Sequence, residues 1–335
     1  MTKLTTITSE NDFLRLVDKY FPATSPHQTL ARVDDCAELL MPREIAMSSD
    51  LFVEDEHFRT SYFTYFEIGH KSLAVNLSDM AAAGAIPLGF NMNLILPKAT
   101  PRQSVEELLK GMSSLAARYS LPLTGGDLTK GEKLGICITV WGQKAGTRFL
   151  RRGECSPGDY IFLLSDAAPM PLGLARAGLT VLEALGRQEA MQRFPEACAA
   201  HLTPTPLVEL GARLANISPG SALMDLSDGL ARDLPRLLGW SQQSKGWGAE
   251  LELEEGILSP ALLDFCREFE LPPLREALLG GEDYLLLGTA KNPEDIEKAA
   301  KESGGHAQII GKVRKSSLLV NGAPLKLDGF DHFSK

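Results

Sequence analysis

Alternating strand-like and helix-like segments between residues 44 and 143 constrain the fold most strongly. Apolar runs, partly alternating with polar residues, predict three strands, and helical apolar spacing predicts two intervening helices. The strands are predicted at 44–53, 89–97 and 135–143, and the helices at 67–85 and 101–120. Gly84 is expected to end the first helix and Pro101 to open the second. This half of the chain is therefore predicted to be α+β.

A second α/β unit is predicted after a connecting segment at residues 146–159, which combines glycines, arginines and a Pro-Gly turn. Strands are expected at 159–165, 282–290 and 306–313, with a helix at 292–304. A chain of 335 residues exceeds the usual size of a single core. We therefore predict two domains, 1–147 for ATP and Mg²⁺ binding and dimerisation, and 148–335 as a C-terminal α/β sandwich domain.

Composition narrows the class of protein. Hydrophobic residues make up 44% and charged residues 23%, which is typical of an ordinary globular protein. The net charge of −9 disfavours a general nucleic-acid-binding surface. Five scattered cysteines form no C-x-x-C pair, and no apolar run approaches the roughly 20 residues that span a bilayer. The sequence predicts a cytoplasmic protein with no membrane partner.

Five short stretches place carboxylates beside small or turn-forming residues. They are "VDDCA" (33–37), "SSDLFVEDEHF" (48–58), "NLSDMAAAGA" (76–85), "TGGDLTKG" (124–131) and "MDLSDG" (224–229). Each has an ordinary structural explanation: Asp35 and Asp50 as turn residues, Asp127 after a Gly-Gly turn, and Asp228 as a helix cap. Asp225 and Asp228 are three apart, so one helical turn would point both carboxylates the same way.

Asp79 is harder to explain structurally. Its neighbours are small or apolar, and an ionised carboxylate buried there costs several kcal/mol unless it is paired. Mg²⁺ takes oxygen ligands and is often held by a few carboxylates together with phosphate oxygens. Gly125 and Gly126 would let the backbone approach a phosphate. Neither a Walker sequence nor the protein-kinase motifs are present, so ATP would be bound on a different scaffold.

Taken in order, these stretches resemble the thiamine-monophosphate kinase family, a branch of the superfamily of aminoimidazole-ribonucleotide and selenophosphate synthetases. "GHKSLAVNLSDMAAAGAIP", "MDLSDGLARDL", "GGEDYLLL" and the terminal "DHF" carry the resemblance over almost the whole chain. It implies phosphorylation of thiamine monophosphate to the diphosphate with ATP and Mg²⁺. It also implies a homodimer formed through the N-terminal sheet.

The resemblance implies three groups of site residues. The metal ligands would be Asp35, Ser48, Ser49, Asp50, Asp79, Asp127, Asp225 and Asp228. Contacts to ATP would come from Gly126, Asp127, Arg152 and Ser227. The thiamine side would be lined by His57, Glu282 and Phe330. No obligatory general base is expected, because the acceptor is already a phosphate anion and positioning with charge neutralisation supplies most of the rate.

Several of these residues keep simpler interpretations. His57 follows acidic residues and could be a surface histidine, Phe330 alone is typical of a core, and Arg152 belongs to a run with Arg148 and Arg151 that is typical of a solvated face. Asp233, one turn after Asp228, is interpreted as a helix-surface or structural carboxylate.

The chain also departs from the family pattern. Val33 replaces a glycine, the turn at 164–173 contains Pro169 and Pro171 in place of glycines, and Leu285 replaces an acidic residue. Two alternatives therefore stay open. One is a related ATP-dependent enzyme acting on another small phosphorylated or carboxylated substrate, and the other is a nucleotide-binding protein that has lost turnover.

Overall fold

The computed structural model describes residues 6–21, 28–30, 36–241 and 246–326. The chain divides into two compact units, Met1–Met80 with Ile86–Gln143, and Ala81–Ala85 with Lys144–Lys335. Both are mixtures of helices and strands, which agrees with the predicted α+β class. The predicted boundary after residue 147, and the roles assigned to its two sides, remain predictions.

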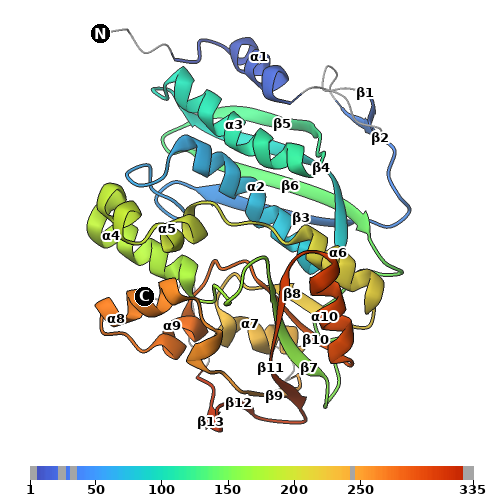
Figure 1. Ribbon diagram of the computed structural model, residues 1–335. Coiled ribbons are helices and arrows are strands. Elements are labelled where there is room, and N and C mark those ends of the chain that lie inside the picture. Colours follow the sequence, from blue (N-terminus) through green and yellow to red (C-terminus); the bar gives the residue numbers. More distant parts are fainter. Residues whose placement is uncertain (1–5, 22–27, 31–35, 242–245, 327–335) are drawn as a thin grey trace. The chain divides into compact units, whose positions relative to one another are not determined.

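The first unit is built on a four-stranded sheet with the order β3-β6-β4-β5. Its strands are β3 (Ala46–Val53), β6 (Gly135–Lys144), β4 (Ala85–Pro97) and β5 (Leu123–Gly131). β3 pairs antiparallel with β6, and β4 pairs parallel with β5. α2 (Tyr65–Ala82) and α3 (Arg102–Arg118) lie along one face of the sheet (Figure 1). β1 (Gln28–Leu30) and β2 (Glu38–Leu39) form a separate two-stranded ribbon.

Alternation along β4 shows that, among the residues that the structure describes, one face of this sheet is covered and the other is not. Phe90, Met92 and Leu94 are buried, whereas Asn93 between them is exposed and Ile95 retains 44% of its accessible surface. Because successive side chains of a strand point to opposite faces, the buried set faces the helices. The other set lies on an uncovered face.

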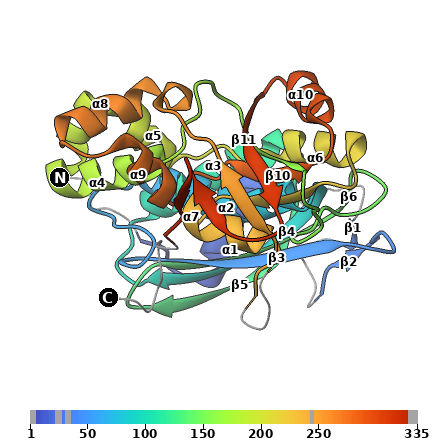
Figure 2. The ribbon, with the colours of Figure 1, turned by 90° about the horizontal axis from the view of Figure 1, so that it is seen from below.

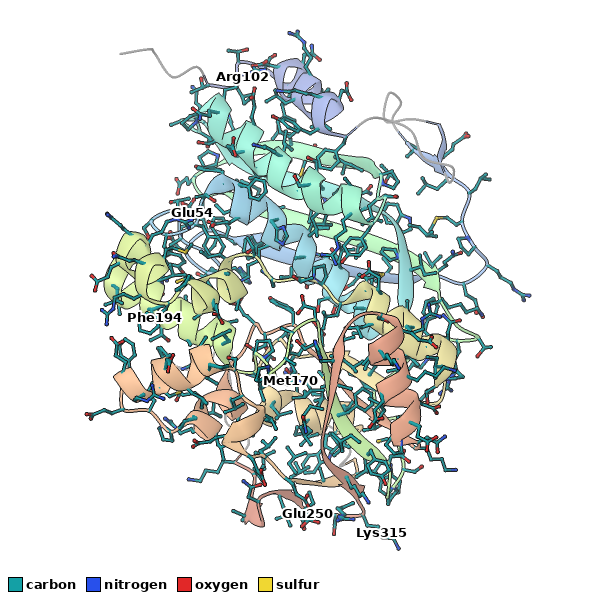
Figure 3. All side chains as sticks on the ribbon, in the orientation of Figure 1. Glu54, Arg102, Met170, Phe194, Glu250 and Lys315 are labelled. Carbon is teal, nitrogen blue, oxygen red and sulfur yellow. The ribbon has the colours of Figure 1, made fainter. Side chains whose placement is uncertain are left out.

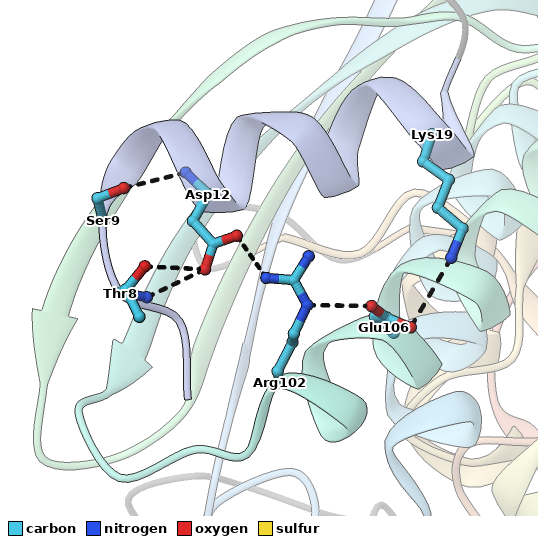
Figure 4. Close-up of polar contacts among 6 residues, drawn as sticks. All are labelled: Thr8, Ser9, Asp12, Lys19, Arg102 and Glu106. Carbon is cyan, nitrogen blue, oxygen red and sulfur yellow. Dashed lines mark hydrogen bonds and ion pairs between the residues drawn. The ribbon is translucent and has the colours of Figure 1, made fainter. Parts of the chain in front are cut away.

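Helix α1 (Glu10–Tyr20) is tied to α3 by a polar network (Figure 4). The Asp12 amide donates to Ser9 Oγ at 3.2 Å, which caps the helix. The Asp12 carboxylate accepts from Thr8 N at 3.1 Å and pairs with Arg102. Arg102 also contacts Glu106, which pairs with Lys19 at 3.8 Å, so both ends of α1 are joined to α3.

The second unit contains a seven-stranded sheet with the order β13-β12-β9-β11-β7-β10-β8. Its strands are β7 (Tyr160–Ser165), β8 (Ala222–Asp225), β9 (Gly248–Leu251), β10 (Leu286–Ala290), β11 (His306–Arg314), β12 (Leu318–Val320) and β13 (Ala323–Pro324). The pairs are antiparallel except β9 with β12. Figure 2 shows α6 and α10 together beside β10 and β11.

The helices of the second unit follow proline or glycine signals. They are α4 (Leu174–Arg193), α5 (Pro195–Leu202), α6 (Val208–Ile217), α7 (Leu230–Leu237), α8 (Pro260–Glu268), α9 (Pro273–Leu279) and α10 (Pro293–Glu302), with a 3₁₀ turn at Glu255–Ile257. α4 is kinked at Gly186, whose φ is +75°. Phe194 lies between α4 and α5 and packs against Phe265 and Phe269 (Figure 3).

Two predicted elements differ from the structure. The Gly-Gly stretch expected to form a turn lies within β5 instead, because it pairs with β4, a contact between segments about 30 residues apart that local propensity does not contain. The strand expected to begin at residue 282 begins at Leu286, because Glu282 and Tyr284 have positive φ angles.

No helix in the described parts of the chain is both long and apolar enough to cross a membrane.

Candidate functional site

Carboxylates from β3 and α2 meet on the helix-covered side of the first sheet. Alternation along β3 points Ser48 and Asp50 toward α2, and Ser48 Oγ donates a hydrogen bond to Asp79 Oδ2. The Asp50 amide donates to Asn76 Oδ1 at 3.2 Å, which fixes the strand against the helix. The structure therefore brings together three of the predicted metal ligands, Ser48, Asp50 and Asp79.

The electrostatics of this pair favour a cation. Burial and, to a smaller extent, the charge of Asp79 together raise the pKa of Asp50 to about 6. Two half-buried carboxylates that disfavour each other's ionised form are stabilised by a divalent ion between them. The site thus has the donor chemistry that Mg²⁺ requires.

Ser49 and Asp127 lie on the opposite, uncovered face. Ser49 Oγ contacts Thr139 Oγ1 at 2.9 Å, and Asp127 is exposed in register with Asn93 of β4. β3 and β5 are the two edges of the sheet, about three strand spacings or roughly 14 Å apart. Within one sheet, Ser49 cannot join Asp50 and Asp79 around one ion because it lies on the other face, and Asp127 cannot because it lies on the other face of the far strand.

Gly126 has a positive φ angle, and the room left by its missing Cβ is filled by β4; its predicted approach to a phosphate remains a prediction. Its φ is +150°, and a Cβ there would lie 1.8 Å from the Met92 carbonyl oxygen of β4. Gly125 has more room, since the nearest atom to its Cβ would be Asn91 Oδ1 at 3.4 Å. The close pairing of β4 and β5 beside Asp127 thus depends on Gly126.

His57 lies in a tight turn after β3. Its Nδ1 accepts a hydrogen bond from Val53 N at 3.2 Å, which assigns the proton of a neutral ring to Nε2. Glu54 accepts hydrogen bonds in the same turn from Thr60 Oγ1 at 2.9 Å and from Leu134 N at 3.1 Å. His57 is half-buried beside the ring of Phe52, with a centroid distance of 5.9 Å. It is therefore an ordered part of an aromatic cluster and not a freely solvated surface histidine.

In the second unit, Asp225 ends β8 and Asp228 lies in the loop before α7. They do not share a helical turn, so that interpretation of their spacing is wrong. Gly229, at φ +101°, is the N-cap of α7 and no side chain caps it, so Asp228 is not the helix cap. Asp228 instead pairs with Arg236 at 2.6 Å and approaches Arg232 at 3.7 Å. Asp225 is 4% exposed.

Loop 226–229 is held by the "GGEDY" stretch. Glu282 N donates to the Ser227 carbonyl at 2.8 Å, and Tyr284 N donates to the Leu226 carbonyl at 2.9 Å. Glu282 Oε2 lies 3.1 Å from Nδ1 of His201, which is 1% exposed. The structure thus brings together Ser227, Asp228 and Glu282, and it adds His201, which the sequence did not single out.

Asp283 is a further residue that the sequence analysis missed. Its carboxylate accepts from Gly173 N at 2.6 Å and from Ala175 N at 3.1 Å, at the start of α4. Burial raises its pKa to about 7 against these two hydrogen bonds, and the Glu282 charge raises it as well. The sequence feature that could have identified Asp283 is its position beside Glu282 in "GGEDY". Asp283 anchors the end of the 164–173 segment that departs from the family pattern.

The remaining predicted residues are placed as follows. Arg152 is exposed, whereas Arg148 is used internally, donating to the Pro219 carbonyl at 2.6 Å and pairing with Glu154. Leu285 is 2% exposed, and its carbonyl accepts from Leu226 N. Asp35, Phe330 and Val33 lie outside the described residues.

In the part of the chain that the structure describes, no three His, Cys, Asp or Glu side chains gather closely enough to hold a metal ion. The carboxylates are instead arranged in smaller groups. Since Mg²⁺ commonly uses one or two carboxylates and completes its shell with substrate phosphates and water, a pair suffices for a metal–nucleotide complex.

The matches of this chain to known proteins identify its class. The model of the AIR synthase related protein, N-terminal domain, matches residues 33–143. The crystal structure of thiamine-monophosphate kinase from Stenotrophomonas maltophilia K279a is similar to this chain with a TM-score of 0.80, at 28% identity, covering 96% of this chain and 98% of that one. The structure of AaThiL complexed with AMPPCP and TMP has a TM-score of 0.74, at 27% identity, covering 97% of each chain.

The sequence comparison is more specific than the fold. The thiamine-monophosphate kinase of Bacillus subtilis (strain 168) is 33% identical over 297 residues, which cover 85% of this chain and 86% of that relative. The chain belongs to the thiamine-monophosphate kinase family.

Proposed function

We propose that this protein transfers the γ-phosphoryl group of ATP to thiamine monophosphate, giving thiamine diphosphate. The observation that carries the proposal is full-length similarity to AaThiL, whose structure was solved with AMPPCP, an ATP analogue, and TMP, which we take as thiamine monophosphate. Both substrates are phosphate anions. The protein must therefore neutralise their charge and align them, which requires metal ions and fixed donors.

Mg²⁺ binding is assigned to carboxylates in both units. Asp50 and Asp79 form a pair whose mutual repulsion a cation would relieve, with Ser48 orienting Asp79. In the second unit, Asp225 and Asp228 supply oxygen ligands of their own, and an ion held there would neutralise charge on a bound phosphate. Asp35 remains a predicted ligand.

Nucleotide and acceptor contacts follow from the remaining residues. Gly126 is the proposed backbone contact to ATP on β5, and the exposed Arg152 offers a planar pair of donors. Ser227 lies in the loop that carries Asp228. On the thiamine side, His57 presents Nε2–H and Glu282 presents a carboxylate suited to a cationic or amino-substituted ring, with Phe330 as the predicted aromatic contact.

A homodimer through the first sheet is part of the proposal. Met47 and Leu51 on the uncovered face keep 68% and 63% of their accessible surface, and such an apolar patch is typical of an interface. A second copy covering this face would also cover Ser49 and Asp127. Asp127 would then serve ATP at the dimer contact.

The test is direct. Purified protein is incubated with ATP, Mg²⁺ and thiamine monophosphate, and thiamine diphosphate is quantified by chromatography. Stoichiometric formation of ADP and thiamine diphosphate is expected. Absence of product in a protein that binds Mg²⁺·AMPPCP would overturn the kinase proposal. A panel of other small phosphorylated or carboxylated acceptors then separates a related enzyme from a binding protein.

A further inference from the structure

Asp233 is fully buried in α7, although the sequence allowed a surface position. Its Oδ2 accepts hydrogen bonds from two consecutive backbone amides, Ser227 N at 3.1 Å and Asp228 N at 2.9 Å. Its Oδ1 accepts from Arg236 Nη1 at 2.9 Å. A buried carboxylate with this set of donors acts as the anchor of the loop that supplies them.

Arg236 extends the same anchor to a side chain. The Nη1 atom that donates to Asp233 also donates to Asp228 Oδ2 at 2.6 Å. Asp233 therefore constrains Asp228 twice, through its backbone amide and, by way of Arg236, through its carboxylate. The next residue, Gly229, packs closely against Gly280: a Cβ added at Gly229 would lie 2.8 Å from the Gly280 carbonyl oxygen, and its φ is +101°. This close packing also restricts the loop.

We infer that Asp233 is a positioning residue for the Mg²⁺–nucleotide complex, holding Ser227 and Asp228 in the orientation that binds it. This inference rests on the proposed function for the roles of Ser227 and Asp228. Asp233 is itself shielded from solvent, with all three of these hydrogen bonds going to its own loop and helix. It acts on the ligand only through the two residues that it holds.

The choice of variants follows from the chemistry. Asp233→Asn keeps the size of the side chain and removes a charge whose burial is costly, so the variant is expected to fold. Its NH₂ group cannot accept, however, so at least one of the three hydrogen bonds is lost. Arg236→Gln keeps the two hydrogen bonds from the Ser227 and Asp228 amides and removes the two that Arg236 donates, to Asp233 Oδ1 and to Asp228 Oδ2. The matched control is Asp264→Asn, because Asp264 pairs with Arg267 at 2.7 Å with the same i,i+3 spacing on an exposed surface of α8.

The primary measurement is the dissociation constant of Mg²⁺·AMPPCP by titration calorimetry, with Tm and hydrogen exchange of a peptide covering 225–230 measured alongside. For Asp233→Asn we expect about ten-fold weaker binding, the effect of losing a charge-assisted hydrogen bond, with faster exchange in the loop. KM for ATP should rise, and KM for thiamine monophosphate should stay unchanged. Arg236→Gln should weaken binding less, and Asp264→Asn not at all.

Unchanged Mg²⁺·AMPPCP affinity in Asp233→Asn would overturn the inference. Equal rises in KM for ATP and for thiamine monophosphate, accompanied by a fall in Tm, would also overturn it. If Asp233→Asn fails to fold, Arg236→Gln decides by the same criteria. If the wild-type protein binds Mg²⁺·AMPPCP but makes no thiamine diphosphate, the proposed function fails. The ratio of the Mg²⁺·AMPPCP dissociation constants of Asp233→Asn and the wild type still decides the role of Asp233. If the wild type does not bind this complex, both proposals fail.

Discussion

At the scale of single residues, burial separates aspartates that look alike in the sequence. Asp50 and Asp79 face each other across β3 and α2, Asp127 is exposed on the other side of the sheet, and Asp233 is enclosed by its own loop. The cost of placing Asp79 among small apolar residues was predictable, because an unpaired buried carboxylate is unfavourable. Its partners, Ser48 and Asp50, come from about 30 residues away, and only the folded sheet supplies them.

Asp79→Asn is expected to remove the repulsion between Asp79 and Asp50. Without Mg²⁺, the free energy of unfolding should rise by about 1 kcal/mol, as is common when a strained functional charge is removed. Stabilisation by Mg²⁺ with ATP should be lost, together with turnover. Thermal unfolding with and without MgCl₂ and ATP measures the change in stability and the loss of stabilisation by Mg²⁺ with ATP, and the thiamine diphosphate assay measures turnover. Asp55→Asn, at an exposed ion pair with Lys133, serves as the control and should keep the response to Mg²⁺. A full Mg²⁺ response in Asp79→Asn would refute the metal role.

At the scale of elements, the helices were easier to predict than the strand edges. α3 has regular apolar spacing, and its start after Pro101 and the end of α2 before Gly84 follow local rules. β5 could not be predicted in the same way, because a strand containing Gly125 and Gly126 has poor intrinsic propensity and exists through its pairing with β4. Likewise, β10 begins late because positive φ angles at Glu282 and Tyr284 interrupt an otherwise strand-like sequence.

Gly126→Ala tests the close approach of β5 to β4. The added methyl group would meet the Met92 carbonyl oxygen, and φ +150° is a conformation that alanine rarely adopts. We expect a loss of stability of about 1–3 kcal/mol and a disproportionate rise in KM for ATP. Gly125→Ala is the matched control, since its methyl group makes only ordinary contact. Equal effects of the two substitutions in urea unfolding and steady-state kinetics would contradict this account.

Asp283 should make stability depend on pH. The pKa of Asp283 is about 7 in the folded protein and its ordinary value is 3.8, so between these values the folded state binds the extra proton. The contribution of this group is therefore fully present below about pH 4 and is lost as the pH rises through 7. Asp283→Asn should flatten this part of the profile. Urea unfolding at a series of pH values checks it, with the exposed Asp166→Asn from the 164–173 segment as control. An unchanged slope in Asp283→Asn would argue against a raised pKa.

At the scale of the whole molecule, the sequence indicated an α+β chain and the positions of α2, α3 and α10, but not which face of each sheet is covered. Alternation in β4 and β6 gives two sets of side chains, and only packing against α2 and α3 decides which set is buried. Ser49 shows the consequence. It was predicted as a metal ligand beside Ser48, yet the strand points it to the uncovered face.

That uncovered face carries the last prediction. Leu51→Asp places a charge in the middle of an apolar surface that the proposed homodimer would bury, where an unpaired charge is costly. The wild type should sediment as a dimer and the variant as a monomer, with unchanged far-UV circular dichroism. Activity should fall with the dimer, because Asp127 lies on the same face. Leu14→Asp, at a leucine of α1 that is 53% exposed and distant from the sheet in sequence, should remain dimeric and active. A fully active wild-type monomer at assay concentrations would refute the interface, since Asp127 would then bind ATP without a second copy.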